Sequence, residues 1–197
     1  MIHAVIKDVE LTFNTSPKLF SPLTVDKGTL VMLSCVEFAP TDKVLDLGCG
    51  YGVVGILAAK LISEDKVVLV DIQPEAVEQA KENASLNGVD GVKVFLSDGV
   101  MDMDEKDFSI ILSNPPYHED FNVAKAFIEK GFNRLALNGR MVMVTKRDTW
   151  YRNKLTAIFG GVRVYQVDGY FVFIAEKRSL SYANKEKKIM KQKHKKK

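Results

Sequence analysis

The chain has 197 residues, of which 46% are apolar and 27% charged, and its formal net charge is +3. This length suits one α/β domain with a sizeable core and is too short for two. No apolar run reaches the roughly 18 residues that suggest a membrane span, and the first residues show neither a basic leader nor a long apolar stretch, so we expect a cytoplasmic protein. Cys35 and Cys49 lack CxxC partners, so neither a disulfide framework nor a metal site is implied.

Residues 1–40 are interrupted by three prolines and predict a strand or hairpin followed by a helix over 29–38. From residue 43 onward, short runs of continuous apolar residues alternate with helical patterns. Such runs indicate strands covered on both faces, which is typical of a mostly parallel sheet. The predicted strands are 43–48, 66–71, 92–97, 108–113 and 140–145, and the predicted helices are 53–62, 75–86 and 123–135.

Turn signals follow two of these helices, Asn87-Gly88 after the second and Asn138-Gly139 after the third, and each is predicted to end its helix. The last two apolar runs, 162–167 and 170–176, are separated by only two residues, which is a strong hairpin signal. One of these strands must therefore run antiparallel to its neighbour. We predict an α/β fold over 1–177, with a doubly wound, mostly parallel seven-stranded sheet that ends in an antiparallel hairpin.

Residues 178–197 have a different composition, with nine Lys/Arg and one acidic residue, a net charge of +8. Residues 1–177 therefore carry a net −5. We expect this basic segment to be a disordered tail outside the folded domain. Two interpretations stay open, a solvated end and a segment that binds polyanions such as RNA.

Residues 44–52, VLDLGCGYG, predict a strand, a glycine-rich turn and the start of a helix, a geometry that lets a ligand approach backbone N–H groups. Residues 50–55 also match the dinucleotide pattern GxGxxG, which alone is weak evidence. Asp46 helps to choose between cofactors, because a carboxylate beside the turn repels the pyrophosphate of NAD and attracts the ammonium of S-adenosylmethionine. Charge therefore favours S-adenosylmethionine.

Asp71 ends the next predicted strand, 25 positions after Asp46. A carboxylate there can accept hydrogen bonds from both hydroxyls of a ribose, and we assign Asp71 and the following Ile72 to the cofactor site. The alternative role for Asp71 is helix capping before Pro74.

The sequence DLGCGYG, followed by an acidic strand end, resembles the cofactor signature of class I S-adenosylmethionine-dependent methyltransferases over about residues 11–177. The resemblance implies that Gly48, Gly50 and Gly52 approach the methionine end of the cofactor. It also implies that Asp98, after the third strand of the repeat, lies beside the adenine, with a turn role before Gly99 as the alternative.

Asn114-Pro115-Pro116-Tyr117 follows the strand predicted over 108–113. Two prolines fix φ and remove two donors, so the strand cannot continue. The Asn114 side-chain oxygen and the Pro115 carbonyl could accept both hydrogens of a conjugated amino group and aim its lone pair, while Tyr117 stacks on the planar acceptor. The alternative is a rigid proline turn. In this position the tetrapeptide resembles the (N/D)PP(Y/F) motif of methyltransferases that modify amino nitrogens, which implies an enzyme with these residues in its catalytic site.

Residues 13–33, together with NPPYH, resemble the RsmC-type branch, which methylates the 2-amino group of guanine in small-subunit ribosomal RNA. The resemblance implies that Phe20, Asp26, Gly28 and Thr29 help to close over the cofactor. It implies ribosomal RNA, or an assembling small ribosomal subunit, as the partner. The alternative is local chemistry, in which Asp26 and Gly28 bracket a turn and Thr29 caps the next helix.

Other acceptors use the same geometry, namely the 6-amino group of adenine and a protein glutamine side chain. Two further classes are a nicotinamide-dependent oxidoreductase and a non-catalytic RNA-binding module. Asp46, the C-terminal hairpin and the proline motif together disfavour the oxidoreductase.

Overall fold

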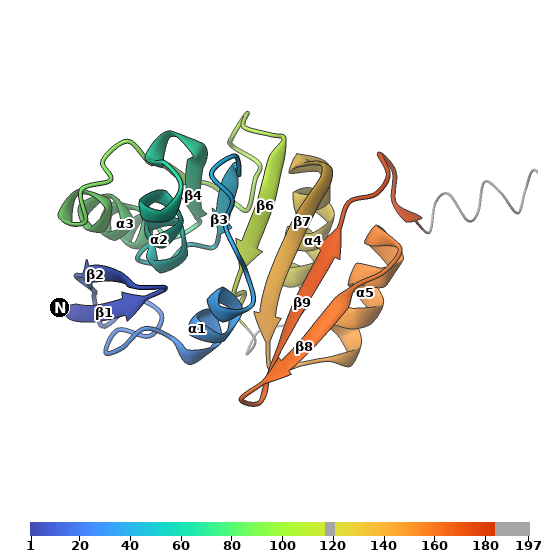
Figure 1. The fold of residues 1–197 in the computed structure, drawn as a ribbon, viewed down its shortest axis with the longest axis horizontal. Helices are drawn as coiled ribbons and strands as arrows, with labels where there is room; N and C mark the ends of the chain where they lie inside the picture. Colours follow the sequence, from blue (N-terminus) through green and yellow to red (C-terminus); the bar gives the residue numbers. More distant parts are fainter. Residues whose placement is uncertain (117–120, 184–197) are drawn as a thin grey trace, which may run out of the picture.

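The computed structural model describes residues 1–116 and 121–183, so Tyr117 and residues 184–197 of the predicted tail lie outside the described residues. In chain order, the helices and strands are β1 (Ile2–Ile6), β2 (Val9–Phe13), α1 (Lys27–Ser34), β3 (Val44–Leu47), α2 (Val53–Leu61), the 3₁₀ helix η1 (Glu64–Lys66), β4 (Val67–Asp71), α3 (Pro74–Leu86), β5 (Lys93–Leu96), β6 (Phe108–Ser113), α4 (Asn122–Arg134), β7 (Leu135–Thr145), α5 (Thr149–Phe159), β8 (Arg163–Val167) and β9 (Tyr170–Glu176). Strands and α-helices alternate along the chain except at β1–β2, β5–β6 and β8–β9, where two strands follow one another (Figure 1).

The main sheet has seven strands in the order β5-β4-β3-β6-β7-β9-β8, and β9 runs antiparallel to both of its neighbours. The other pairings in this sheet are parallel. The predicted doubly wound sheet with an antiparallel C-terminal hairpin is therefore confirmed. The direction of winding reverses between β3 and β6, and ligands of such sheets bind outside the carboxyl ends of the strands at this point.

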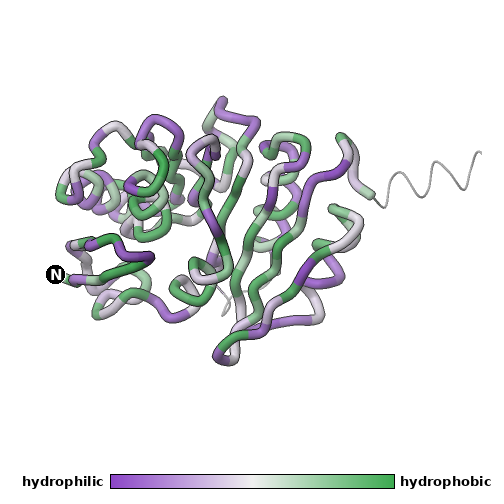
Figure 2. Tube along the Cα trace, viewed as in Figure 1, coloured by the Kyte–Doolittle hydropathy of each residue, from purple (hydrophilic) through white to green (hydrophobic). Residues whose placement is uncertain are grey.

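Apolar side chains cover both faces of the sheet. On one face α1, α2, α3 and the N-terminal hairpin enclose one cluster, and on the other face α4 and α5 enclose a second. Successive residues of β3 alternate between the two, since Val44 belongs to the first cluster and Leu45 to the second. The hydropathy of the chain follows this arrangement, with apolar strands at the centre (Figure 2). Burial on both faces explains why the strands are continuously apolar.

The N-terminal hairpin β1–β2 forms its own two-stranded sheet and packs on α2 and α3. Asn83 in α3 and Asn87, the residue that caps its C-terminus, bind the backbone of β2 and of the residue that follows it. The Asn87 side chain exchanges hydrogen bonds with the backbone of Thr12, and the fully buried Asn83 does so with Asn14 and also donates to the carbonyl of Tyr51. These contacts attach the N-terminal segment to the glycine-rich turn.

Helix α1 differs from its prediction over 29–38. It begins two residues earlier, at Lys27, because Asp26 is the N-cap and its carboxylate accepts from the Thr29 N–H at 2.8 Å. Thr29 is therefore inside the helix and is not its cap. The helix ends at Ser34.

The prediction that Asn138-Gly139 ends α4 is wrong. The chain passes directly from Arg134 into β7, and Asn138, with φ +66°, lies within the strand, where the β6–β7 register shifts. The Asn138 N–H donates to the Lys177 carbonyl, and the Lys177 N–H donates to the Gly139 carbonyl. A left-handed Asn followed by Gly suits a bulge as well as a helix end.

Helix α5 is absent from the predicted elements, although Tyr151, Leu155, Ile158 and Phe159 are buried at helical spacing. Beyond β9 the chain keeps contact with α4, where the Tyr182 hydroxyl donates to the Glu129 carbonyl at 3.0 Å. Among residues 1–116 and 121–183, no helix is long and apolar enough to cross a membrane.

Candidate active site

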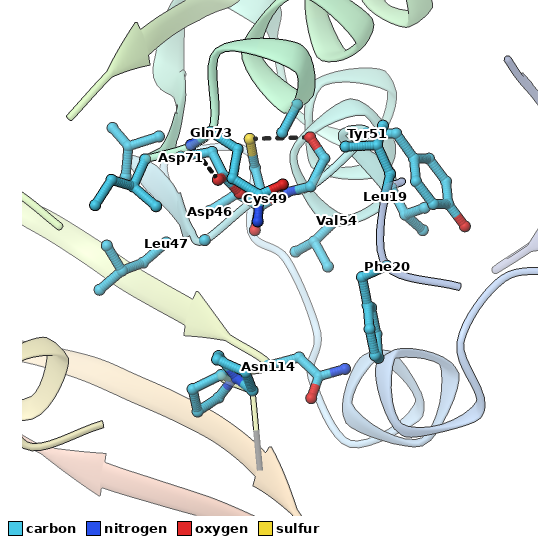
Figure 3. A pocket seen from close by; sticks show the side chains of 18 of the residues that line it. Leu19, Phe20, Asp46, Leu47, Cys49, Tyr51, Val54, Asp71, Gln73 and Asn114 are labelled. Carbon is cyan, nitrogen blue, oxygen red and sulfur yellow. Dashed lines mark hydrogen bonds between the residues drawn. The ribbon is translucent and has the colours of Figure 1, made fainter. Parts of the chain in front are cut away.

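A cavity of about 280 Å³ opens at the carboxyl ends of β3, β4, β5 and β6. In Figure 3, Asp46 and Asp71 lie near the glycine-rich turn, and Asn114 lies across the cavity from them. The structure thus brings most of the predicted site residues to one place. Those that line the cavity are Phe20, Asp26, Thr29, Asp46, Gly48, Gly50, Asp71, Ile72, Asp98, Asn114 and Pro115.

Gly28 and Gly52 do not line the cavity. A Cβ on Gly28 would lie 2.8 Å from a ring carbon of Tyr170 and 2.9 Å from a carboxylate oxygen of Asp26, so glycine lets α1 pack closely against β9. Gly52 has φ +98° and is the N-cap of α2, a conformation that side chains rarely adopt. Both glycines therefore shape the backbone around the cavity.

The glycine-rich turn folds back onto β4. The N–H groups of Gly48 and Cys49 both donate to the carbonyl of Val70 at 2.9 Å, and the Gly50 N–H donates to Asp71 at 2.8 Å. Gly48 and Gly50 have φ of +77° and +54°. These three N–H groups therefore hold the shape of the turn, and the start of α2, at Val53 and Val54, lines the cavity.

Asp71 organises the backbone at the end of β4. One carboxylate oxygen accepts from Gly50 N–H, and the other accepts from Gln73 N–H at 2.9 Å. Gln73, not Asp71, is the N-cap of α3. Each carboxylate oxygen keeps further acceptor capacity beside the cavity.

Asp46 is 3% exposed and accepts from the Gly55 N–H, in the first turn of α2, at 2.8 Å. Burial raises the pKa of Asp46 to about 7; the Gly55 hydrogen bond opposes this rise, and the negative charge of Asp71 adds to it. A carboxylate therefore already occupies the positive end of α2, where a dinucleotide would place its pyrophosphate. The site suits a bound cation better than a phosphate.

Asn114 is fixed by contacts with two distant parts of the chain. The preceding Ser113 hydroxyl donates to the Leu47 carbonyl at 2.7 Å, which ties the end of β6 to the end of β3. The Asn114 side-chain nitrogen donates to Asp26 at 2.9 Å and to the Thr29 hydroxyl at 3.0 Å. Its two hydrogens are thus engaged by the start of α1.

The rim of the cavity consists of exposed side chains. Ile72 is 63% exposed on the β4 side, Asp98 is exposed after β5, and Phe20, which the N-terminal segment contributes, is 51% exposed. These residues can contact a ligand that enters from solvent. Tyr117, which was predicted to stack on the acceptor, lies outside the described residues.

Two aromatic residues of the cavity, Phe127 and Tyr51, were not among the predicted site residues. Phe127 of α4 lies beside the turn, since a Cβ on Gly48 would be 3.4 Å from its ring. Tyr51 lies within the glycine signature and packs edge-on against Phe13 at 5.7 Å. Sequence alone gives no signal for Phe127, because an apolar residue on a helix face usually belongs to the core.

Basic and aromatic residues gather just after β7, the strand next to β6. Lys146 and Arg147 are exposed; the Lys146 amine lies 5.0 Å from the centre of the Tyr170 ring and the Arg147 guanidinium 5.0 Å from that of Phe121. Trp150 stacks on Phe121 with ring centres 4.3 Å apart. Cations beside aromatic rings are the groups that contact phosphates and bases of single-stranded nucleic acids.

The fold and the cavity define a class of protein. A seven-stranded sheet with an antiparallel β9, a glycine-rich turn after β3 and an acidic residue at the end of β4 are the features of class I methyltransferases. The sequence model of the methyltransferase small domain matches residues 10–175. The chain belongs to this family and is an S-adenosylmethionine-dependent methyltransferase. The nicotinamide alternative is thereby excluded.

Individual relatives support this assignment. The uncharacterized protein YbxB of Bacillus subtilis (strain 168) is 30% identical, and the match covers 87% of this chain and 89% of YbxB. The ribosomal RNA small subunit methyltransferase C of Psychromonas ingrahamii is 34% identical over 84% of this chain and 48% of its own length. The solved T. thermophilus 16S rRNA N2 methyltransferase RsmC, in complex with AdoMet and guanosine, has a TM-score of 0.80 and 31% identity, over 89% of this chain and 50% of that one. The chain spans about half the length of these two methyltransferases.

Proposed function

We propose that the protein methylates the exocyclic 2-amino group of a guanine in small-subunit ribosomal RNA, either free or in an assembling subunit in the cytoplasm. The observation that carries this proposal is the fixed side chain of Asn114 at the cavity. Its nitrogen is held by Asp26 and Thr29, so its oxygen is the atom that remains to accept a hydrogen bond from an amine.

The cavity residues fit S-adenosylmethionine. Asp46 would pair with the ammonium of the methionine moiety, Asp71 and Ile72 would contact the ribose, and Asp98 would lie beside the adenine. When bound, the cofactor supplies a methyl group on a sulfonium, which is an activated leaving group. Asp46 is buried and has a raised pKa, so a bound cation would favour its charged form and pair with it.

The acceptor side relies on Asn114 and Pro115. The amine of guanine is conjugated with its ring, which makes its lone pair poorly available. Two acceptors, the Asn114 side-chain oxygen and the Pro115 carbonyl, would take both N–H hydrogens and leave the lone pair directed at the methyl group. No general base is required, since the nitrogen can release its proton to solvent once methylated. Tyr117 would stack on the base.

The substrate class rests on further support. Relatives named for ribosomal RNA methylation are 30% or more identical, and the T. thermophilus protein was solved with guanosine. The Lys146 and Arg147 cluster beside β6 could contact the phosphates on either side of the target. The 2-amino group lies in the base-paired edge of an A-form helix, so the target must be unpaired or flipped.

Nucleoside mass spectrometry of small-subunit ribosomal RNA, from cells with and without the gene, tests the proposal. We expect N2-methylguanosine to be lost on deletion, restored by the intact gene and not restored by Asn114→Ala. Loss of N6-methyladenosine instead would support the adenine alternative. Methyl transfer to glutamine-containing peptides by the purified protein, with ribosomal RNA unaffected, would support the protein-substrate alternative. If neither RNA nor peptides are methylated, the proposed substrate is wrong.

A further inference from the structure

The N-terminus of α1 and the end of β6 meet in one polar cluster beside the cavity. A single carboxylate oxygen of Asp26 accepts from both the Thr29 N–H, at 2.8 Å, and the Asn114 side-chain nitrogen, at 2.9 Å. The Thr29 hydroxyl, on a residue that is 8% exposed, accepts from the same nitrogen at 3.0 Å. The two ends of this contact are 88 residues apart in the sequence.

The orientation of the Asn114 amide follows from the chemistry of its partners. A side-chain amide has one face that donates and one that accepts, and the two have almost the same shape. An ionised carboxylate can only accept, so the side of Asn114 that faces Asp26 must be the NH₂ group. Its hydrogens point to Asp26 and Thr29, and within residues 1–116 and 121–183 no hydrogen bond to its oxygen is found.

Gly28 makes room for this arrangement. A Cβ at this position would lie 2.9 Å from the oxygen of Asp26 that holds Asn114, and 2.8 Å from the Tyr170 ring. Any side chain would therefore have to displace the Asp26 carboxylate and the Tyr170 ring, or move the helix. In the pattern Asp-x-Gly-Thr at 26–29, Asp26 and Thr29 accept the hydrogen bonds of Asn114, and Gly28 leaves the space that this contact needs.

We propose that Asp26 and Thr29 are positioning residues, which lock the Asn114 amide with its oxygen toward the methyl acceptor. This assigns them to the acceptor side of the site, whereas the sequence resemblance assigned them to cofactor closure. The identity of the acceptor rests on the proposed function, but the lock itself does not. Without it, the amide can rotate by half a turn and present donors to an amine that also donates, which prevents binding of the acceptor in the reactive orientation.

Four substitutions separate this role from ordinary capping. Asp26→Ser keeps a good N-cap, but its hydroxyl is too short to reach Asn114 as well. Asp26→Asn keeps both the cap and an oxygen in the same place. It should therefore retain most of the amide protection and most of the kcat that Asp26→Ser loses. Thr29→Val removes the hydroxyl, and Thr29→Ser retains it as the matched control.

Nuclear magnetic resonance tests the lock without any substrate. In full-length protein labelled with ¹⁵N-asparagine, the side-chain NH₂ pair of Asn114 is the pair missing from the spectrum of Asn114→Ala. We expect these protons to exchange slowly with water in the unmodified protein and in Asp26→Asn, and rapidly in Asp26→Ser. Slow exchange that persists in both Asp26→Ser and Thr29→Val would overturn the proposal.

Kinetics provide the second measurement, with methyl transfer to small ribosomal subunits from cells that lack the gene. We expect Asp26→Ser to lower kcat about tenfold or more, as loss of a hydrogen bond to a charged group implies, while the Kd for S-adenosylmethionine changes less than about threefold. An unchanged kcat would show that Asp26 acts only as a helix cap. A Kd for S-adenosylmethionine that changes as much as kcat would show that Asp26 belongs to the cofactor site. If the unmodified protein does not methylate these subunits, the proposed function fails, and the exchange rates of Asn114 still decide whether the lock exists.

Discussion

Substitution of Asp71 by alanine separates the backbone role of this residue from its proposed contact with the cofactor. The variant removes the acceptor for the Gly50 N–H, which is partly buried, and for the Gln73 N–H, which is exposed and can bond to water instead. Loss of the partly buried hydrogen bond to the Gly50 N–H should lower the free energy of unfolding by about 1–3 kcal/mol. Loss of the ribose hydrogen bonds should weaken S-adenosylmethionine binding by about 1.5–3 kcal/mol, which corresponds to roughly a 10- to 150-fold higher Kd.

Isothermal titration calorimetry of the folded variant measures this change, with thermal unfolding as the check on stability. Asp90→Ala is the matched control, because Asp90 is also acidic but is exposed and does not line the cavity. We expect the control to bind the cofactor as the unmodified protein does. A folded Asp71→Ala variant with unchanged affinity would refute the cofactor role and leave Asp71 as a residue that shapes the glycine-rich turn.

Four further predictions follow from the site and the fold. Asn114→Ala should nearly abolish methyl transfer and change the Kd for S-adenosylmethionine only a few fold, and an equal loss of both would contradict its role in holding the acceptor. Because burial raises the pKa of Asp46 to about 7, cofactor binding should tighten as the pH rises from about 6 to about 8 and should release protons, which calorimetry in two buffers detects; an affinity independent of pH would argue against the ammonium contact. A chain that ends at Ala183 should show a shallower dependence of log RNA affinity on log salt, by about 3–4 if five tail cations contact single-stranded RNA, whereas identical slopes would make the tail a solvated end. Gly55→Ala should destabilise the protein by about 1–3 kcal/mol in thermal unfolding, since its Cβ would lie 2.4 Å from the branched carbon of Leu69; a stabilised variant would show that this contact relaxes.

Much of the site was accessible from the sequence because its signals are local. The glycine turn and the two prolines restrict the backbone locally, and an acid often follows a strand, so Asp71 and Asn114 could be placed at the ends of two predicted strands. Parallel strands then bring those ends together, as the cavity shows. The direction of the Gly48 and Gly50 N–H groups was not accessible, because it depends on which carbonyl of β4 lies opposite the turn.

By itself, the sequence determined the alternation of strands and helices, the parallel sheet and the antiparallel end, because burial on both faces leaves continuous apolar runs and a two-residue turn allows only a hairpin. Tertiary structure decided the contacts between distant segments. A helix cap and a catalytic amide look like separate local features in the chain. Only the packing of α1 on β7 and β9 brings Asp26 to the end of β6, 2.9 Å from Asn114. Likewise, Asn138-Gly139 fits either a helix end or a bulge, and the hydrogen bonds to Lys177 choose the bulge. Local conformation depends on neighbours in the sequence, whereas the hydrogen-bond partner of a polar group depends on which distant segments the packing of the sheet and helices brings beside it.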